Sequence, residues 1–203
     1  MKLDVPVIGI LRGVAYDFLG QVMTAAFSAG LQAIEVTFNT DQAEQMVAEY
    51  RHQLPEGKML GMGTIRNIAE ARKAVAAGAM FIVTPNFDSA VIDYAIAHGV
   101  PVVAGAFTPT EVYAAWSAGA AMIKVFPCGS IGPDYIRELR GPFDQIPLVA
   151  VGGVRLDNMT TYFEAGAHAV GVGDALFGKT ALAQRSVEDI EINVKRFINK
   201  IVS

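Results

Sequence analysis

Two charged residues interrupt otherwise apolar segments of the sequence: Lys124 in AMIKVFP and Glu35 in LQAIEVT. A charge in such a segment is costly to bury unless it is paired, so both positions are candidates for chemistry. A lysine removed from water near other cations has a lowered pKa, and its neutral amine can attack a carbonyl carbon to form a Schiff base. A carboxylate close by can carry protons between the intermediates. The alternative is a structural ion pair between Lys124 and Glu35.

A positive side chain and two glycine-rich turns are candidates for binding an anionic substrate. Arg12 follows the apolar run VIGIL, and its guanidinium group can grip a carboxylate through two hydrogen bonds or form a salt bridge at the rim of the fold. Gly152-Gly153-Val154 and Gly171-Val172-Gly173-Asp174 each end a β-rich run. Glycine lets backbone N–H groups approach phosphate oxygens, so these turns predict a phosphate site, although a tight turn alone would also favour glycine.

The histidines and the single cysteine form no recognisable metal-binding or nucleophilic motif. His52, His98 and His168 show no HxH or HExxH spacing, so a histidine metal site is not expected. A lone cysteine, Cys128, excludes an intramolecular disulfide and a cysteine-built zinc site. Cys128 follows the Lys124 segment, but no histidine is placed to activate it, so we expect a neutral thiol.

The composition indicates one folded domain that spans residues 1–203. Hydrophobic residues make up 52% of the chain and charged residues 18%, and the formal net charge is −4. The 16 Lys and Arg residues are scattered, which argues against binding to nucleic acid or to an anionic membrane. The pattern of a signal peptide is interrupted by charges and no apolar run reaches membrane-spanning length, so we expect a cytoplasmic protein.

A repeated pattern predicts the elements that must position these residues. Helix-like segments end in a small residue plus glycine, and a β-rich run follows directly, as in SAG-LQAIEVT and SAG-AAMIKVFP. Glycine is favoured just after a helix because it adopts left-handed backbone angles. The predicted strands are 5–11, 33–37, 58–62, 80–84, 101–105, 121–126, 147–151 and 168–172. The predicted helices are 16–29, 40–53, 67–77, 88–98, 109–118, 132–140, 157–165 and a long one over about 175–200.

Eight strand–helix units favour an α/β fold, a closed single-domain (β/α)8 TIM barrel. Runs such as MFIV and LVAV are continuously apolar, which is typical of parallel strands covered on both faces. An open doubly wound sheet is the alternative, and the number and even spacing of the units favour the barrel. In such barrels the active site lies at the carboxyl ends of the strands. Polar residues expected there are Arg12, Glu35, Thr37, Asn39, Thr64, Thr84, Asn86, Thr108 and Lys124.

The segments IEVTFNT, GMGTI, VTPN, MIKVFP and LVAVGGV, in this order, resemble the 2-keto-3-deoxy-6-phosphogluconate (KDPG) and 2-keto-3-deoxy-6-phosphogalactonate (KDPGal) aldolases. The resemblance covers almost the whole chain. It implies a (β/α)8 barrel assembled as a homotrimer, with no metal or organic cofactor. The implied reaction is Schiff-base cleavage of a six-carbon phosphorylated keto acid to pyruvate and glyceraldehyde 3-phosphate.

The same resemblance implies a role for individual residues. Lys124 matches the Schiff-base lysine and Glu35 the general acid and base of the family. Thr64 matches the threonine that holds the pyruvyl carboxylate. The remaining matches are Pro85 and Phe126, which line the pocket, and Gly152, Gly153, Gly173 and Asp174 at the phosphate end.

Four positions bear on the substrate. Gluconate-type enzymes resemble EVTLRT, where this chain has Asn39, and Arg12 can supply the missing positive charge as in the galactonate-type branch. Val151 stands where gluconate-type enzymes tend to have a threonine linked to C4 stereochemistry, and Asp174 stands where a serine is common. These positions favour KDPGal or mixed specificity.

Other activities stay open at this point. The same site could act on unphosphorylated 4-hydroxy-2-oxoglutarate, since a carboxylate at position 174 is unfavourable beside a phosphate unless it turns away or accepts helix N–H bonds. A phosphate-binding isomerase or decarboxylase could use Glu35 and Lys124 without a covalent step. A barrel that binds a phosphorylated sugar acid without catalysis is the third possibility.

Overall fold

The strands form a closed parallel barrel. The structure is a computed structural model that describes residues 1–202. Each strand pairs with the next in the sequence, and β8 closes the ring by pairing with β1. The strands are β1 Val7–Leu11, β2 Ala33–Thr37, β3 Met59–Gly63, β4 Ile82–Val83, β5 Val102–Ala106, β6 Met122–Val125, β7 Leu148–Val151 and β8 Ala169–Val172. The predicted (β/α)8 barrel is confirmed, and the open doubly wound sheet is excluded.

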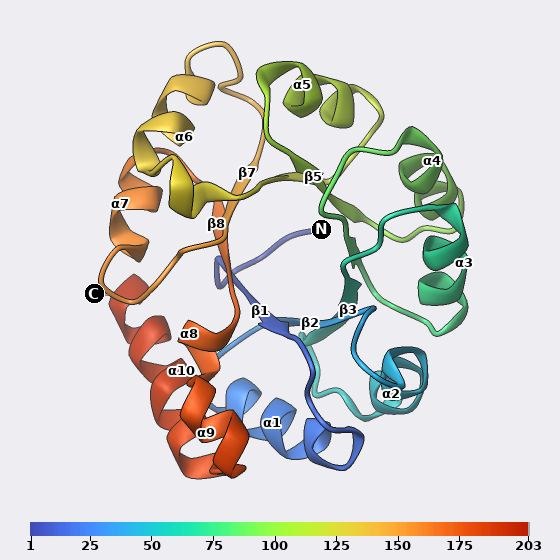
Figure 1. Cartoon of the computed structure of the whole chain (residues 1–203), viewed down its shortest axis with the longest axis vertical. Coiled ribbons are helices and arrows are strands. Elements are labelled where there is room, and N and C mark those ends of the chain that lie inside the picture. Colours follow the sequence, from blue (N-terminus) through green and yellow to red (C-terminus); the bar gives the residue numbers. More distant parts are fainter. Residues whose placement is uncertain (203) are drawn as a thin grey trace.

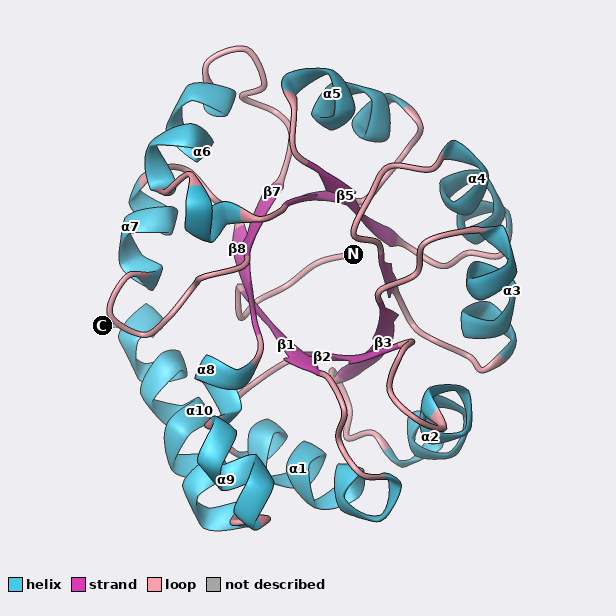
Figure 2. Ribbon diagram, viewed as in Figure 1, coloured by secondary structure: helices cyan, strands magenta, loops and turns pink. Residues whose placement is uncertain are grey.

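Helices surround the ring of strands on its outer side (Figures 1 and 2). They are α1 Tyr16–Ser28, α2 Ala43–Tyr50, α3 Ile68–Ala76, α4 Ser89–Ala97, α5 Pro109–Ser117, α6 Pro133–Arg140, α7 Met159–Glu164, α8 Asp174–Phe177, α9 Lys179–Gln184 and α10 Val187–Val202, with 3-10 turns η1 Arg51–Gln53 and η2 Cys128–Ser130. The glycines that mark the repeat, Gly30, Gly78, Gly99, Gly119 and Gly166, all have positive φ. They therefore end their helices in the left-handed conformation that the sequence predicted.

The predicted continuous helix over 175–200 is wrong, because the chain forms α8, α9 and α10 there. Gly178 has a φ of 84° and Arg185 a φ of 55°, and neither angle fits a right-handed helix. Strand β4 is also shorter than the predicted 80–84. Its backbone bonding nevertheless continues on both sides, since Met80 N–H donates to Leu60 and Thr84 N–H to Val103.

The apolar side chains form two layers of core, one between barrel and helices and one inside the barrel. The inner cluster comprises Ile8, Ala33, Phe81, Val83, Val103, Met122, Val149, Val151 and Ala169. Met1 and Leu3 pack against this cluster from the end where the strands begin. Figure 1 shows the amino terminus inside the outline of the ring. One end of the barrel is thus filled by apolar side chains, which leaves the carboxyl ends of the strands for a polar site.

Within the described residues, no helix combines the length and the hydrophobicity needed to cross a membrane.

Candidate active site

A cavity of about 210 Å³ lies at the carboxyl ends of the strands. Its lining residues are Ile10, Arg12, Glu35, Thr64, Pro85, Lys124, Phe126, Val151, Gly152, Gly153, Val154, Gly171 and Gly173. Most of the residues singled out in the sequence are thus brought together. Two residues that the resemblance linked to the substrate, Asn39 and Asp174, are not among the lining residues. The other polar residues expected at the strand ends that do not line the cavity are Thr37, Thr84, Asn86 and Thr108. Ile10 lines the cavity without having been singled out in the sequence, whereas Val154 and Gly171 belong to the two predicted glycine-rich turns.

Strands β6 and β2 carry Lys124 and Glu35 into the barrel. Lys124 is 6% exposed and Glu35 is 1% exposed. The two side chains form no salt bridge within 4.0 Å, and in the described part of the chain Glu35 Oε2 has no hydrogen-bond partner. The nitrogen of Lys124 lies 5.0 Å from the ring centroid of Phe126. A closed ion pair, the structural alternative, is therefore absent from this site.

Burial controls the protonation of both groups. Desolvation raises the pKa of Glu35 from 4.5 to about 7, although the positive charges of Lys124 and Arg12 oppose the shift. Desolvation lowers the pKa of Lys124, and Arg12 adds to this effect while Glu35 opposes it. Both shifts favour the neutral form. A neutral amine and a carboxyl group that titrates near neutral pH are suited to nucleophilic attack and proton transfer.

Arg12 is held at the cavity by two polar neighbours. Its Nη1 donates to Asn39 Oδ1 over 2.9 Å, and its Nη2 approaches Thr64 Oγ1 at 3.4 Å. Asn39 is therefore connected to the site through Arg12 instead of lining the cavity itself. Thr64 has a φ of +59°, which costs about 1–3 kcal/mol in a residue with a Cβ. Backbone strain of this kind is often found at functional sites.

The glycine pair after β7 turns backbone groups toward the cavity. Gly152 and Gly153 have φ values of 90° and 73°, which only glycine adopts without strain. The Gly153 carbonyl accepts a hydrogen bond of 3.0 Å from Asn158 Nδ2. Because carbonyl and N–H point in opposite directions across a trans peptide, the N–H of Val154 faces away from Asn158. Gly152, Gly153 and Val154 all line the cavity, so the backbone of this turn borders one end of it.

Asp174 lies beside the cavity instead of inside it. It is the first residue of α8, and the backbone of Gly173 precedes the helix. With Arg12 and Lys179, Asp174 lines a neighbouring depression of about 450 Å³. Asp174 therefore does not line the cavity at the strand ends, whereas Gly171 and Gly173 of the same turn do.

Thr84 fixes the turn that carries Pro85 into the cavity. Its hydroxyl accepts a hydrogen bond of 2.8 Å from the N–H of Gly105 and donates one of 2.7 Å to the carbonyl of Asn86. A Cβ on Gly105 would lie 2.3 Å from the carbonyl carbon of Pro85, so only glycine allows this close approach. The sequence placed Thr84 at a strand end but did not indicate its inward hydrogen bonds.

The family model for KDPG and KHG aldolases matches residues 3–192. The chain belongs to this aldolase family. It is therefore a carbon–carbon lyase, as the sequence resemblance implied. The 2-dehydro-3-deoxy-6-phosphogalactonate aldolase of Escherichia coli (strain K12) is 33% identical over 97% of this chain and 96% of its own. The 2-dehydro-3-deoxy-phosphogluconate aldolase of Treponema pallidum is 33% identical over 68% of this chain and 66% of its own.

Among solved structures, a native KDPGal structure aligns with a TM-score of 0.93 and 32% identity, covering 100% of this chain and 97% of that one. Proteins named for either substrate are thus similar to this chain. Because these relatives are named for different C4 epimers, the residues of the site must determine which epimer this enzyme prefers.

Two further residues near the strand ends of this aldolase, Cys128 and Thr108, have side chains that are engaged in hydrogen bonds of the local structure. Cys128 is buried, its Sγ donates to the Val125 carbonyl over 3.1 Å, and burial raises the pKa of its thiol to about 11. The prediction of a neutral thiol agrees with this environment. Thr108 caps α5 in a reciprocal arrangement with Glu111.

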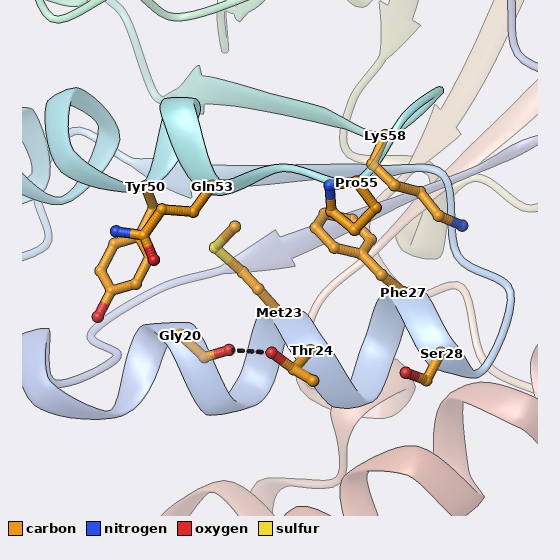
Figure 3. Close-up of a pocket in the computed structure, with 9 residues that line it drawn as sticks. All are labelled: Gly20, Met23, Thr24, Phe27, Ser28, Tyr50, Gln53, Pro55 and Lys58. Atoms are coloured by element: carbon orange, nitrogen blue, oxygen red, sulfur yellow. Dashed lines mark hydrogen bonds between the residues drawn. The ribbon is translucent and has the colours of Figure 1, made fainter.

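A second cavity, of about 330 Å³, lies outside the barrel between α1 and the segment from Tyr50 to Lys58 (Figure 3). Lys58 lines it, and the ammonium group donates a 2.7 Å hydrogen bond to the Leu31 carbonyl. Burial lowers the pKa of Lys58. None of the predicted site residues lines this cavity.

Proposed function

We propose that the protein is a class I aldolase that cleaves a 2-keto-3-deoxy-6-phospho sugar acid, KDPGal or both KDPGal and KDPG, to pyruvate and glyceraldehyde 3-phosphate. The observation that carries this proposal is the pairing of a buried Lys124, whose pKa is lowered, with a buried Glu35 that has an unpartnered oxygen in the same cavity. Schiff-base catalysis needs such a nucleophile and such a proton carrier.

The first half of the proposed reaction forms the iminium ion. Neutral Lys124 Nζ attacks the C2 carbonyl carbon, and one proton moves from the attacking nitrogen to the carbonyl oxygen to give a neutral carbinolamine. Glu35 in its acid form donates the proton with which the hydroxyl group leaves as water. Lys124 is then joined to C2 through a protonated imine, which can accept an electron pair.

The second half breaks the carbon–carbon bond. Ionised Glu35 removes the proton of the C4 hydroxyl group, C4 becomes the aldehyde carbon, and the electrons of the C3–C4 bond move into an enamine. Glyceraldehyde 3-phosphate leaves. The enamine takes a proton from Glu35 at C3, and water hydrolyses the resulting iminium ion to release pyruvate and free Lys124.

The binding roles divide the cavity into two ends. Arg12 and Thr64 hold the pyruvyl carboxylate, since a guanidinium group and a hydroxyl group converge there. Pro85 and Phe126 line the pocket around the reacting carbons. The phosphate end consists of Gly152, Gly153, Val154 and Gly173, with Asp174 outside it.

We infer a preference for the galactonate epimer from two site residues and one relative. Arg12 supplies the charge that Asn39 does not, and Val151 places an apolar side chain in the cavity. The Escherichia coli enzyme named for the galactonate substrate is 33% identical over 97% of this chain, against 27% over 98% for the Haemophilus influenzae enzyme named for the gluconate.

Steady-state kinetics with both C4 epimers and with 4-hydroxy-2-oxoglutarate test this proposal. Cleavage of a phosphorylated acid with kcat/KM well above that for 4-hydroxy-2-oxoglutarate supports it, and Lys124→Ala should abolish turnover. A higher kcat/KM for 4-hydroxy-2-oxoglutarate would reassign the substrate. Aldol cleavage that survives Lys124→Ala would contradict a Schiff base on Lys124. For Glu35→Gln we expect kcat to fall about 100-fold or more because the proton carrier is lost.

We also propose a homotrimer, on the basis of the family resemblance. Three large apolar side chains on or next to α5 are exposed: Phe107 by 39%, Tyr113 by 60% and Trp116 by 37%. Tyr113 and Trp116 are three residues apart on α5 and share one face of the helix, and grouped exposed aromatic side chains are typical of protein interfaces. Sedimentation velocity should give three times the chain mass of 21.6 kDa, and a species of one chain mass would contradict the trimer.

A further inference from the structure

One wall of the catalytic cavity is apolar and is built by three neighbouring strands. Ile10 on β1, Gly171 on β8 and Val151 on β7 all line the cavity. A Cβ on Gly171 would lie 2.8 Å from Val151 Cγ2 and 3.3 Å from Ile10 Cδ1. The two branched side chains therefore converge over the space that Gly171 leaves empty. We call Ile10 and Val151 the apolar wall.

The apolar wall fills the arc between the nucleophile and the proton carrier. Around the ring, β7, β8 and β1 lie between β6, which carries Lys124, and β2, which carries Glu35. In the parallel register Ile10 is paired with Glu35, so their side chains project to the same side of the sheet. Ile10 also packs against the inner core cluster. Ile10 is therefore the direct neighbour of Glu35 inside the barrel mouth.

The substrate must pass this wall, provided that the proposed function is correct. Its C2 atom is bonded to Lys124, and its phosphate lies at the glycines that follow β7 and β8. Carbons C4 and C5 therefore run between Glu35 and the apolar wall. The hydroxyl group on C4 faces Glu35 in one epimer and the wall in the other. The side chains of Ile10 and Val151 offer no hydrogen-bond partner.

We propose that Ile10 is a specificity-determining residue, which together with Val151 rejects the C4 epimer whose hydroxyl group faces the wall. A hydroxyl group buried there loses its hydrogen bonds to water and gains none from the protein. The sequence resemblance links position 151 to C4 stereochemistry, and the geometry adds Ile10 because both side chains meet over Gly171. Selection thus acts through an unfavourable contact with the wrong epimer.

The test places a hydroxyl group on the wall. Ile10→Thr keeps a β-branched side chain and adds a partner for the misdirected hydroxyl. We expect the ratio of kcat/KM values for the two epimers to shrink about tenfold. Ile10→Val, which stays apolar, should change the ratio less than about threefold. Ile8→Val, on the same strand but below the cavity, is the control for packing. Ile10→Ser carries the hydroxyl with less bulk and replaces Ile10→Thr if that variant does not fold.

The ratio separates specificity from general damage. A merely structural role of Ile10 would lower kcat/KM for both epimers by the same factor, and an unchanged ratio in Ile10→Thr would overturn the inference. A parent enzyme without epimer preference would overturn it as well. Exchange of the C3 hydrogens of pyruvate with deuterium, which involves Lys124 and Glu35 but no C4 atom, tests the proposed function separately. Exchange and cleavage in the parent with an unchanged ratio in the variant would refute only the role of Ile10.

Discussion

The carboxyl group of Glu35 lies directly against Gly63. A Cβ built on Gly63 would come within 2.5 Å of Glu35 Cδ and within 2.6 Å of both carboxyl oxygens. Because Glu35 Oε2 has no hydrogen-bond partner among residues 1–202, the position of this carboxyl group is set by packing more than by hydrogen bonds. The missing side chain at position 63 is what allows Glu35 to sit where the proposed mechanism needs it.

We therefore expect Gly63→Ala to displace the Glu35 carboxyl group and to lower kcat by about 100-fold, since a misplacement of about 1 Å has effects of that size. Steady-state kinetics on the phosphorylated substrate measure this. Gly141→Ala is the control, because a Cβ at Gly141 would lie 3.4 Å from its nearest neighbour, the Glu138 carbonyl. A kcat for Gly63→Ala near that of the parent would show that Glu35 does not depend on this contact.

Glu35→Gln should stabilise the fold, and more so at high pH. The folded-state pKa of Glu35, about 7, lies above its ordinary value of 4.5, so the folded chain binds this proton more tightly than the unfolded chain. The contribution of protonated Glu35 to the free energy of unfolding is fully present below pH 4.5 and is lost as the pH rises to about 7. The advantage of Glu35→Gln over the parent should grow by about 2–3 kcal/mol between pH 4 and pH 8, as urea unfolding would show.

Glu111→Gln is the matched control with the opposite sign. Hydrogen bonds from the backbone N–H groups of Thr108 and Phe107 lower the pKa of Glu111. Its contribution to stability is therefore present above the ordinary pKa and lost as the pH falls. Glu111→Gln should destabilise the protein at pH 8. The same pH trend in both variants would contradict the assignment of the Glu35 shift to burial.

Arg12→Lys should raise KM for the phosphorylated substrate about tenfold, because a lysine cannot hold a carboxylate through two parallel hydrogen bonds. Asn39→Ala should have a smaller effect in the same direction, since Asn39 contacts Arg12 instead of lining the cavity. Arg137→Lys, which alters an exposed arginine paired with Asp134, is the control. A larger rise in KM for Asn39→Ala than for Arg12→Lys would point to direct substrate binding by Asn39.

Thr84→Val should cost about 1–3 kcal/mol in unfolding free energy, because it leaves the N–H of Gly105 and the carbonyl of Asn86 without their shared partner. Thr84→Ser keeps the hydroxyl group and should restore most of this loss. Urea unfolding measures both variants. Equal stability of Thr84→Val and the parent would mean that other contacts hold the Pro85 turn.

The barrel could be predicted because its signals are local. A glycine after each helix and an apolar run after each glycine repeat along the chain, and Gly30 and Gly119 adopt the positive φ that this pattern requires. Lys124 and Glu35 stood out for a similar reason, since each is a charge in a strand that is buried on both faces. The C-terminal helices were mispredicted because Gly178 breaks a periodic pattern that continues on both sides of it.

Contacts between distant strands could not be predicted from the sequence. Ile10 looks like any core isoleucine until the register places it next to Glu35 and over Gly171. The position of Asp174 depends on where α8 begins, because this first residue of the helix lines the neighbouring depression and not the cavity. Gly63 has no side chain that could indicate a function. It matters because the carboxyl group of Glu35 occupies the space where a Cβ at position 63 would lie.

Chemical trapping on Lys124 tests the proposed Schiff-base mechanism most directly. The protein is incubated with pyruvate, reduced with borohydride and digested, and the peptides are analysed by mass spectrometry. The Schiff-base mechanism predicts a reduced pyruvyl adduct on the peptide that contains Lys124, and no adduct in Lys124→Ala or in a sample that is reduced without pyruvate. Absence of the adduct in an enzyme that turns over its substrate, or an adduct confined to another lysine such as Lys58, would contradict it.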